Sequence, residues 1–297
     1  MSAGVIGGID LGGTKIEARL FEGPEAATVR TRRVPTPLRD FETLAAAVAE
    51  QIGWLEREGG QRIPVGVAVP GVIDPVTGEG FASNVPLTGR SLAAELSQAR
   101  GRPVPVVNDC MAFALSEARG GAGEGARVVM GLVLGTGVGG GLCIDGAVPP
   151  RHAGLAVEIG HVAASARALA RHDLPLLPCG CGREGCVETY VSGTGIANIG
   201  KIRTGRRIKA HEGPPEDVLA AWEDVAGDML AAIQMMLDPD VIVLGGGLSN
   251  MDGIEERLSR ALSRSRLGEA KPPRILRARH GDSSGARGAA LLAAAAC

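Results

Sequence analysis

The chain has 297 residues, of which 45% are hydrophobic and 2% aromatic, and its formal net charge at pH 7 is −2. This length allows a full hydrophobic core and is typical of two lobes rather than one. The near-neutral charge argues against nucleic-acid binding, and no uncharged apolar run approaches the ~18 residues needed to cross a bilayer. No cationic stretch precedes the N-terminal apolar run, which Asp10 interrupts, so we expect a cytoplasmic protein.

The first predicted elements are two strands on either side of a glycine-rich turn. Residues 5–11 form an apolar run, and after the turn at 12–15 apolar and charged residues alternate over 16–20. A P-loop or a dinucleotide fingerprint opens a helix instead, so this pattern predicts a hairpin. Its backbone N–H groups and the Thr14 hydroxyl suit phosphate oxygens, and Asp10 is placed to hold a metal-bound water. An ordinary glycine hairpin is the alternative.

The rest of the first half predicts one amphipathic helix and two buried strands. Residues 40–58 have the period of a helix with Asp40 as its N-cap. Val65–Val69 and Val104–Val107 are short apolar runs of the kind found in buried strands. The second run ends at Asn108-Asp109, and we expect polar groups at such strand ends to point toward a cleft.

A second glycine-rich turn occupies residues 135–141, again between two strand-like apolar runs. The chain therefore repeats the order strand, Gly-Thr turn, strand at places about 120 residues apart, which indicates two lobes built on one plan. Two such hairpins, one in each lobe, would grip a nucleoside triphosphate from both sides.

The C-terminal part alternates predicted helices with one more strand. Glu216–Leu237 and Ile254–Ser265 have the pattern of helices, and Val241–Leu244 reads as a strand. The turn Gly245–Gly247 follows that strand, where a flat ring could rest on a surface free of side chains. Close packing of strand on helix explains these glycines equally well. The chain ends in an Ala-rich helix over 286–296, which is too short to span a membrane.

Three cysteines within eight residues form the most specific pattern in the chain. Cys179, Cys181 and Cys186 lie in a glycine-rich loop, and His161 is available as a fourth ligand. Thiolates at this spacing wrap around one tetrahedral zinc ion, so we predict a structural zinc site. Unrelated cysteines are the alternative. Three cysteines lie outside this cluster, the first two expected to be buried: Cys110, Cys143 and Cys297.

These segments, in this order, resemble the ROK family of sugar kinases over residues 5–294. The motifs that carry the resemblance are Asp10-Leu-Gly-Gly-Thr-Lys15, Asn108-Asp109, Leu134–Gly141, Glu158-Ile-Gly-His161, Cys179–Cys186 and Leu244-Gly-Gly-Gly247. The resemblance implies an α/β, two-lobed fold of the actin, hexokinase and Hsp70 ATPase superfamily, with ribonuclease H-like lobes and an active-site cleft. It assigns residues 1–110 plus 284–297 to a small N-terminal lobe and 111–283 to a large lobe with the zinc-binding loop and the adenosine site.

Within that family the chain is most similar to bacterial N-acetylglucosamine kinases. The segments concerned are 84–86, 113–118, 130–136, 279–282 and 287–290. The resemblance implies ATP-dependent phosphorylation of the 6-hydroxyl of N-acetyl-D-glucosamine, with ATP, Mg2+ and structural Zn2+ as cofactors. Fructokinases and mannokinases are nearly as similar, and glucokinase activity is a further alternative. Val157 stands before Glu158 where the family usually has glycine, which concerns the acceptor sugar more than the reaction.

Two alternatives belong to other functional classes. A non-catalytic sugar or ATP binder would lack a catalytic base, whereas Asp109 matches the aspartate that serves as the base in the family. A sugar-sensing repressor needs a helix-turn-helix domain before the first hairpin, and only about five residues precede the first strand here. The resemblance also implies a homodimer, with a small-molecule sugar as substrate and no nucleic-acid or membrane partner.

The resemblance assigns roles to individual residues. The expected sugar contacts are Asn84, Asn108, Asp109, Glu158, His161 and Glu188. The expected contacts to the ATP phosphates are Asp10, Gly12, Gly13, Thr14, Gly135, Thr136 and Gly137, with Lys15 either on phosphate or in solvent. Gly246 and Gly247 are expected near the adenosine, and the zinc ligands would be His161, Cys179, Cys181 and Cys186.

Most of these assignments have a structural alternative. Asp109 could instead cap the helix that follows it, because Asp is common at such junctions. Glu158 and Glu188 could form ion pairs, and Asn84 could be a turn residue before Pro86. His161 has two expected functions, since one ring nitrogen could bind zinc while the other donates to a sugar oxygen.

Overall fold

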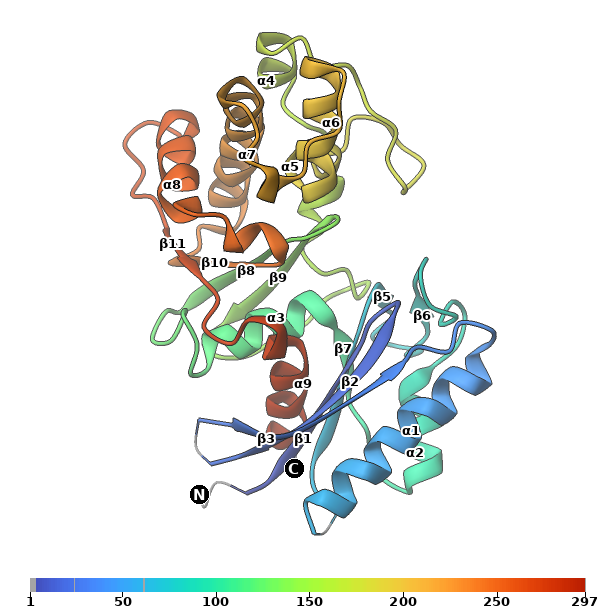
Figure 1. Ribbon diagram of the computed structural model, residues 1–297. Helices are drawn as coiled ribbons and strands as arrows, with labels where there is room; N and C mark the ends of the chain where they lie inside the picture. The colour runs from blue at the N-terminus through green and yellow to red at the C-terminus, as the bar shows by residue number, and fades with distance from the viewer. Residues whose placement is uncertain (1–3, 24, 61, 297) are drawn as a thin grey trace. The chain divides into compact units, whose positions relative to one another are not determined.

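The computed structural model describes residues 4–23, 25–60 and 62–296, and these residues form two compact units (Figure 1). The first unit comprises the described residues of 1–124, 141–156 and 280–297, and the second comprises 125–140 and 157–279. The expected α/β class is confirmed in both units. The first unit includes residues 111–124 and 141–156, which the resemblance assigns to the large lobe. Compact units and lobes are different divisions of the chain, and the expected lobe boundaries at 110 and 284 stay a prediction.

A five-stranded sheet forms the centre of the first unit. Its strand order is β3-β2-β1-β4-β7. Strand β2 pairs antiparallel with both β1 and β3, whereas β4 and β7 run parallel to β1. The strands are β1 (Ile6–Leu11), β2 (Lys15–Glu22), β3 (Ala27–Pro35), β4 (Val65–Val69) and β7 (Val106–Asn108). The expected hairpin is confirmed, because β1 and β2 pair from Ile6 opposite Phe21 to Leu11 opposite Ile16. The expected strand from Val104 begins only at Val106, since Pro105 has no N–H to donate to a neighbouring strand.

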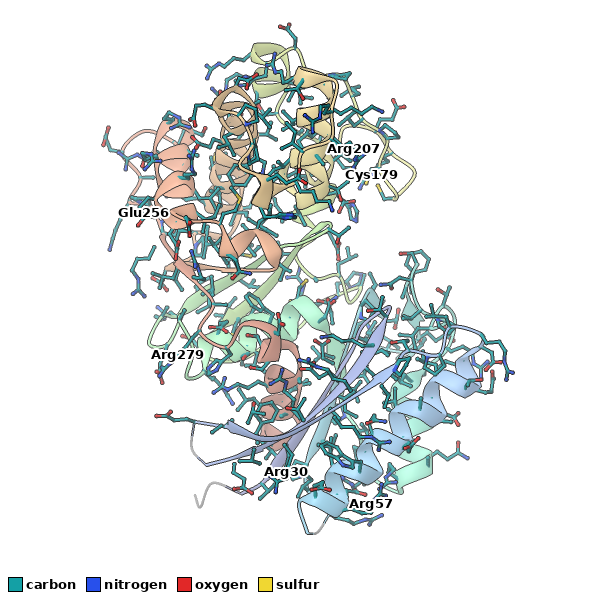
Figure 2. All side chains as sticks on the ribbon, in the orientation of Figure 1. Arg30, Arg57, Cys179, Arg207, Glu256 and Arg279 are labelled. Atoms are coloured by element: carbon teal, nitrogen blue, oxygen red, sulfur yellow. The ribbon has the colours of Figure 1, made fainter. Side chains whose placement is uncertain are left out.

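Two helices cover opposite faces of this sheet. Helix α1 (Phe41–Glu58) begins where expected, with the Asp40 carboxylate accepting a hydrogen bond from the Thr43 N–H at 2.8 Å. Its last turn carries Arg57, labelled in Figure 2, where a cation is favoured by the helix dipole. Helix α9 (Ser284–Ala295) starts two residues earlier than expected and lies so close to β1 that a Cβ on Gly8 would collide with the Ala286 carbonyl.

Smaller elements complete the first unit. They are β5 (Val72–Ile73), β6 (Gly80–Phe81), α2 (Leu92–Arg100), α3 (Asp109–Ala118) and η4 (Gly281–Ser283). Helix α3 follows β7 directly and packs along α9, so the strand that ends at Asn108 leads straight into a helix that is supported by α9. Cys143 is buried as expected, whereas Cys110 is only half-buried because it sits in the first turn of α3. Cys297 lies outside the described residues.

A four-stranded sheet forms the centre of the second unit. Its order is β11-β10-β8-β9, with β10 parallel to both β8 and β11. The strands are β8 (Val128–Leu134), β9 (Val138–Ile144), β10 (Val241–Gly245) and β11 (Arg274–Arg277). The second predicted strand, turn and strand are thereby confirmed, and residues 138–140 of β9 belong to this unit.

Helices pack around this second sheet. They are α4 (Ala166–Arg171), α5 (Glu188–Val191), α6 (Gly193–Thr204), α7 (Glu216–Leu237) and α8 (Ile254–Ser265), with the short turns η1 (Ile159–His161), η2 (Ala210–Glu212) and η3 (Gly247–Asn250). Helices α7 and α8 have the bounds that the sequence predicts. Trp222 of α7 is fully buried and donates its indole N–H to the Val191 carbonyl at 2.8 Å. Among the described residues, no helix has the length and apolar character that crossing a membrane requires.

Candidate functional site

The first glycine turn is fixed by Thr36, the residue that directly follows strand β3. The Gly12 N–H donates to the Lys15 carbonyl at 2.9 Å, and the Thr36 hydroxyl donates to the Gly12 carbonyl at 2.7 Å. The Thr36 N–H also donates to the Thr14 carbonyl at 3.1 Å, while the Thr14 side chain is exposed. The turn is therefore held rigidly with an exposed hydroxyl, as a phosphate-binding hairpin requires. Thr36 carries no signal in the sequence that could have found it.

Lys15 pairs with a buried acid next to this turn. Its ammonium lies 3.4 Å from a carboxylate oxygen of Glu17, which also contacts the guanidinium groups of Arg19 and Arg33. Burial raises the pKa of Glu17, but the hydrogen bonds from the two arginines outweigh burial and lower it. The Lys15 side chain is therefore exposed to solvent and is also paired with Glu17.

Asp10 and Asp109 form an electrostatically coupled pair of carboxylates in the first unit. Burial and, next, the charges of Asp109 and Glu17 raise the pKa of Asp10 to about 7. Two carboxylates that repel each other in this way suit a hard divalent cation, which favours oxygen ligands. The donor set therefore fits the expected Mg2+.

Helix α3 begins at Asp109, but its N-cap is Asn108. The Asn108 amide oxygen accepts hydrogen bonds from the N–H groups of Cys110 and Met111 at 2.9 and 3.0 Å. Its amide nitrogen donates to the Gly71 carbonyl at 2.9 Å, so local hydrogen bonds fix the orientation of this buried side chain. The second hydrogen of the amide nitrogen can still donate to a ligand. Asp109 also accepts a hydrogen bond from the Cys110 N–H, at 2.7 Å. The alternative capping role proposed for Asp109 thus belongs to its neighbour.

Asn84 lies beside the first glycine turn. It is exposed, and a Cβ built on Gly13 would lie 3.1 Å from its amide nitrogen. A candidate sugar contact and a candidate phosphate hairpin are therefore neighbours within the first unit.

Sequence reasoning missed a buried polar group at the far end of α3. Glu117 is fully buried and accepts hydrogen bonds from the Ser284 hydroxyl at 2.8 Å and the His280 N–H at 3.1 Å. Its second oxygen accepts from the Ala122 N–H at 3.0 Å. Glu117 therefore joins α3, which carries Asp109, to the start of α9. The signal was present, because an acid within an otherwise apolar helical run needs buried partners.

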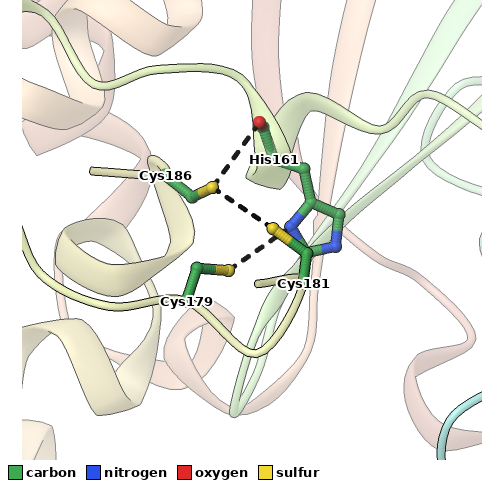
Figure 3. Close-up of side chains that lie close together, drawn as sticks. All are labelled: His161, Cys179, Cys181 and Cys186. Carbon is green, nitrogen blue, oxygen red and sulfur yellow. Dashed lines mark hydrogen bonds between the residues drawn. The ribbon is translucent and has the colours of Figure 1, made fainter. Parts of the chain in front are cut away.

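The second unit brings the four predicted metal ligands together (Figure 3). Their ligand atoms all lie within 4.8 Å of one another. The Cys179 sulfur is 3.7 Å from Nδ1 of His161, and the sulfurs of Cys181 and Cys186 are 3.6 Å apart. Zinc–sulfur bonds of about 2.3 Å at tetrahedral angles separate sulfurs by nearly the same distance, about 3.8 Å. The cluster could therefore hold a metal ion with little rearrangement.

Glu188 lies between this cluster and the second glycine turn. One carboxylate oxygen accepts a hydrogen bond from the Cys179 thiol at 3.0 Å and is 3.6 Å from Nδ1 of His161. The other accepts from the Val138 N–H at 3.4 Å, and a Cβ on Gly137 would lie 2.7 Å from it. Glycine at 137 therefore makes room for this carboxylate. Glu158 is half-buried at the start of η1, and within the described part of the chain it forms no ion pair.

The second glycine turn borders a cavity of about 1100 Å³ in the second unit. Gly246 has a φ of 77°, and a Cβ there would approach the Leu134 carbonyl and the Gly135 nitrogen, so glycine lets the two turns touch. The Gly193 N–H at the start of α6 donates to the Gly135 carbonyl at 2.8 Å. The cavity wall includes Gly135, Thr136, Thr194, Arg207, Lys209 and Gly247.

Comparison with known proteins identifies the family. Residues 6–296 match the ROK family. The chain belongs to the ROK family. Among the curated relatives of this ROK protein, the N-acetylgalactosamine kinase AgaK of Shewanella sp. strain ANA-3 is 41% identical over 96% of this chain and 95% of that protein. An N-acetyl-D-glucosamine kinase of Pectobacterium atrosepticum is 40% identical over 96% of this chain and 97% of that protein.

A solved structure confirms the expected fold of this ROK protein. The ROK hexokinase of Thermus thermophilus matches it with a TM-score of 0.83 and 33% identity, covering 98% of each chain. The predicted site residues divide between the two units. The first unit holds Asp10, Gly12, Gly13, Thr14, Lys15, Asn84, Asn108 and Asp109. The second holds Gly135, Thr136, Gly137, Glu158, His161, Cys179, Cys181, Cys186, Glu188, Gly246 and Gly247.

Proposed function

We propose that this ROK protein transfers the γ-phosphoryl group of ATP to the 6-hydroxyl of N-acetyl-D-glucosamine. The observation that carries the proposal is the similarity, over nearly the whole chain, to kinases that are named for N-acetylhexosamines. The arrangement of polar groups in both units agrees with phosphoryl transfer, which depends on positioning and on charge stabilisation.

Asp109 is the proposed general base. A sugar hydroxyl is a poor nucleophile, and a carboxylate that accepts its proton makes attack on phosphorus easier. Because Asn108 supplies the helix cap, the Asp109 carboxylate is not needed for that role. Asp10 is the proposed ligand of a water on Mg2+, the ion that neutralises charge on the transferred phosphoryl group when it is bound.

The nucleotide is proposed to occupy the cavity of the second unit. The Gly135–Gly137 turn and the Thr136 hydroxyl would face its phosphates, and Gly246-Gly247 would lie against the adenosine. Support comes from the packing of Gly246 on Leu134, which places both turns at the same cavity wall. In the first unit, residues 12–14 would contact phosphate through backbone N–H groups and the Thr14 hydroxyl.

Five polar side chains are proposed to recognise sugar hydroxyls: Asn84, Asn108, Glu158, His161 and Glu188. Amides and carboxylates suit this function because each binds neighbouring hydroxyls in a fixed orientation. Nδ1 of His161 faces the sulfur cluster, so its Nε2 would carry the proton and donate to the sugar. Glu188 touches the same cluster, which would fix the orientation of both groups.

We assign the cluster of His161 and the three cysteines to structural zinc. A donor set of one imidazole and three thiolates binds zinc in preference to Mg2+ or Ca2+, which take oxygen ligands. Bound zinc would supply rigidity to the loop that carries Cys179 and to His161. A homodimer and a cytoplasmic location complete the proposal as expectations from the family.

A second acceptor is favoured by a specific observation. The relative AgaK, at 41% identity, is named for N-acetylgalactosamine, which differs from N-acetylglucosamine only in the configuration at C4. The test is kcat/KM for ATP-dependent phosphorylation of both sugars, with N-acetylmannosamine, glucose, mannose and fructose for comparison. The proposal expects N-acetylglucosamine to lead, and a lead for the galactose epimer would replace the acceptor while keeping the reaction.

A further inference from the structure

Three contacts hold the second glycine turn in place. The Gly193 N–H, at the start of α6, donates to the Gly135 carbonyl at 2.8 Å. The Val138 N–H donates to a carboxylate oxygen of Glu188 at 3.4 Å. A Cβ on Gly160 would lie 2.1 Å from the Val138 carbonyl oxygen, so the backbone of η1 rests directly on this residue. The end of the turn, where β9 begins, is therefore fixed through both the N–H and the carbonyl of Val138.

Each of these contacts comes from a segment that also carries a metal ligand. Gly160 immediately precedes His161, and Glu188 follows Cys186 by two residues. The short helix α5 then leads directly to Gly193. The two segments meet at the cluster, where the sulfur of Cys186 lies 3.6 Å from the His161 carbonyl oxygen (Figure 3). Only a few residues of chain therefore separate the metal cluster from each contact to the glycine turn.

Hydrogen bonds anchor the segment that runs between the cluster and α6. Tyr190 of α5 is fully buried, and its hydroxyl donates to the Pro175 carbonyl at 2.8 Å and accepts from the Leu177 N–H at 3.1 Å. The Val187 N–H donates to the Val162 carbonyl at 2.9 Å. Helix α5 is therefore tied both to the loop that leads to the cysteines and to the chain that follows the histidine ligand.

Glu188 joins the cluster to the turn through its two carboxylate oxygens. One oxygen contacts Cys179 and His161, and the other lies against the peptide between Gly137 and Val138. The Glu188 side chain is only 21% exposed, so water competes little for these contacts. A carboxylate whose position is set by metal ligands on one side therefore sets the position of a turn amide on the other.

We propose that Glu188 is a positioning residue that couples the metal cluster to the second glycine turn, so that zinc at the cluster strengthens nucleotide binding at the turn. This role adds to the sugar contact proposed for Glu188. Coupling between two binding sites is reciprocal, so nucleotide strengthens zinc binding by the same factor. The effect on nucleotide rests on the proposed function, because it requires the ATP phosphates to lie against this turn. The ordering of the turn by zinc does not.

The test compares three variants with the unmodified chain, all loaded with zinc and free of sugar. Glu188→Ala removes the contacts to the cluster and to the turn. Glu188→Gln keeps them, because its amide oxygen accepts from the Val138 N–H and its NH2 group donates to a sulfur. The matched control, Glu184→Ala, removes an exposed acid from the same loop. Because sugar is absent, the proposed sugar contact of Glu188 does not affect the comparison.

Two quantities are measured for each protein. The first is amide hydrogen exchange in the peptide that covers residues 134–140, which reports the local stability of the turn. The second is the Kd of a non-hydrolysable ATP analogue by titration calorimetry. Both are repeated after zinc has been removed with a chelator, and metal analysis checks the zinc content of each sample.

With zinc bound, we expect Glu188→Ala to exchange the turn amides faster and to bind the analogue about fivefold more weakly, the factor that corresponds to one hydrogen bond of ordinary strength. Glu188→Gln and Glu184→Ala should stay within about twofold of the unmodified protein. Removal of zinc should raise the Kd of the unmodified protein by a similar factor of about five. In Glu188→Ala it should change the Kd less than about twofold, because the connection is already broken.

Three results would overturn the coupling: unchanged exchange at the turn in zinc-loaded Glu188→Ala, equal acceleration of exchange throughout α8, which indicates general loosening, or equal zinc dependence of the Kd with and without Glu188. Should Glu188→Ala fail to keep zinc, the unmodified protein with and without chelator decides the question, and unchanged exchange at residues 134–140 refutes the coupling. Faster exchange at the turn without any change in Kd would instead contradict the proposed place of the nucleotide. A failed proposed function is therefore distinguishable from a failed coupling.

Discussion

Glu117 offers the sharpest test of how the first unit is held together. In Glu117→Ala the Ser284 hydroxyl and the N–H groups of His280 and Ala122 lose their acceptor, and the two N–H groups cannot rotate away. A buried donor left without a partner, such as the Ser284 hydroxyl, costs ~1–3 kcal/mol, the two part-buried N–H groups cost less because water can reach them, and truncation also leaves a small cavity. We therefore expect the free energy of unfolding to fall by about 2–5 kcal/mol.

The assay is urea unfolding followed by circular dichroism, with Glu117→Gln as the matched control. Glutamine keeps the shape and one acceptor oxygen, so it should lose only about 1–2 kcal/mol, the difference between a charged and a neutral acceptor. Turnover measured well below the unfolding transition should stay within a few-fold, because Glu117 lies at the opposite end of α3 from Asp109. A loss below about 1 kcal/mol in the alanine variant would refute the role of Glu117 as a buried acceptor.

Further predictions concern the two candidate sites. Asp109→Asn should keep the KM for sugar but lower kcat by about 10²–10⁴, the usual worth of a general base, and near-normal steady-state turnover would exclude that role. The purified chain should carry about one zinc per molecule by metal analysis, and Cys186→Ser should lose it while the control Cys143→Ser keeps it; equal metal content in both would argue against the cluster. Asp10 is ionised more readily when unfolded than when folded, so the native state loses stability as the pH rises from about 4 through its folded pKa of about 7. Without Mg2+, Asp10→Asn should therefore unfold at a higher temperature than the unmodified protein at pH 8, with the difference vanishing near pH 4, and a pH-independent difference would contradict the raised pKa.

Local signals explain why much of the fold could be predicted from the sequence. The glycine turns and the flanking apolar runs predicted both hairpins, and Asp40 predicted the start of α1. Helices α7 and α8 matched their predicted bounds because long apolar periodicity and clear breakers define them. The start of β7 was missed because an apolar pattern does not register that Pro105 lacks a donor.

The parts that could not be predicted depend on contacts between distant residues. Glu117 and Ser284 are separated by 167 positions, so no local pattern could pair them. The spacing of the cysteines predicted the cluster, but not that Nδ1 of His161 faces it or that Glu188 touches both the cluster and the second glycine turn. That Asn108 rather than Asp109 is the N-cap of α3 was likewise open until their hydrogen bonds were known.

Product analysis distinguishes the proposed reaction from its alternatives. The protein is incubated with ATP, Mg2+ and N-acetyl-D-glucosamine, and the products are identified by phosphorus and proton NMR, with Asp109→Asn as the comparison. We expect stoichiometric ADP and N-acetylglucosamine 6-phosphate from the unmodified protein and almost none from the variant. ADP without a sugar phosphate, phosphate at another hydroxyl, or equal product from both proteins would contradict it.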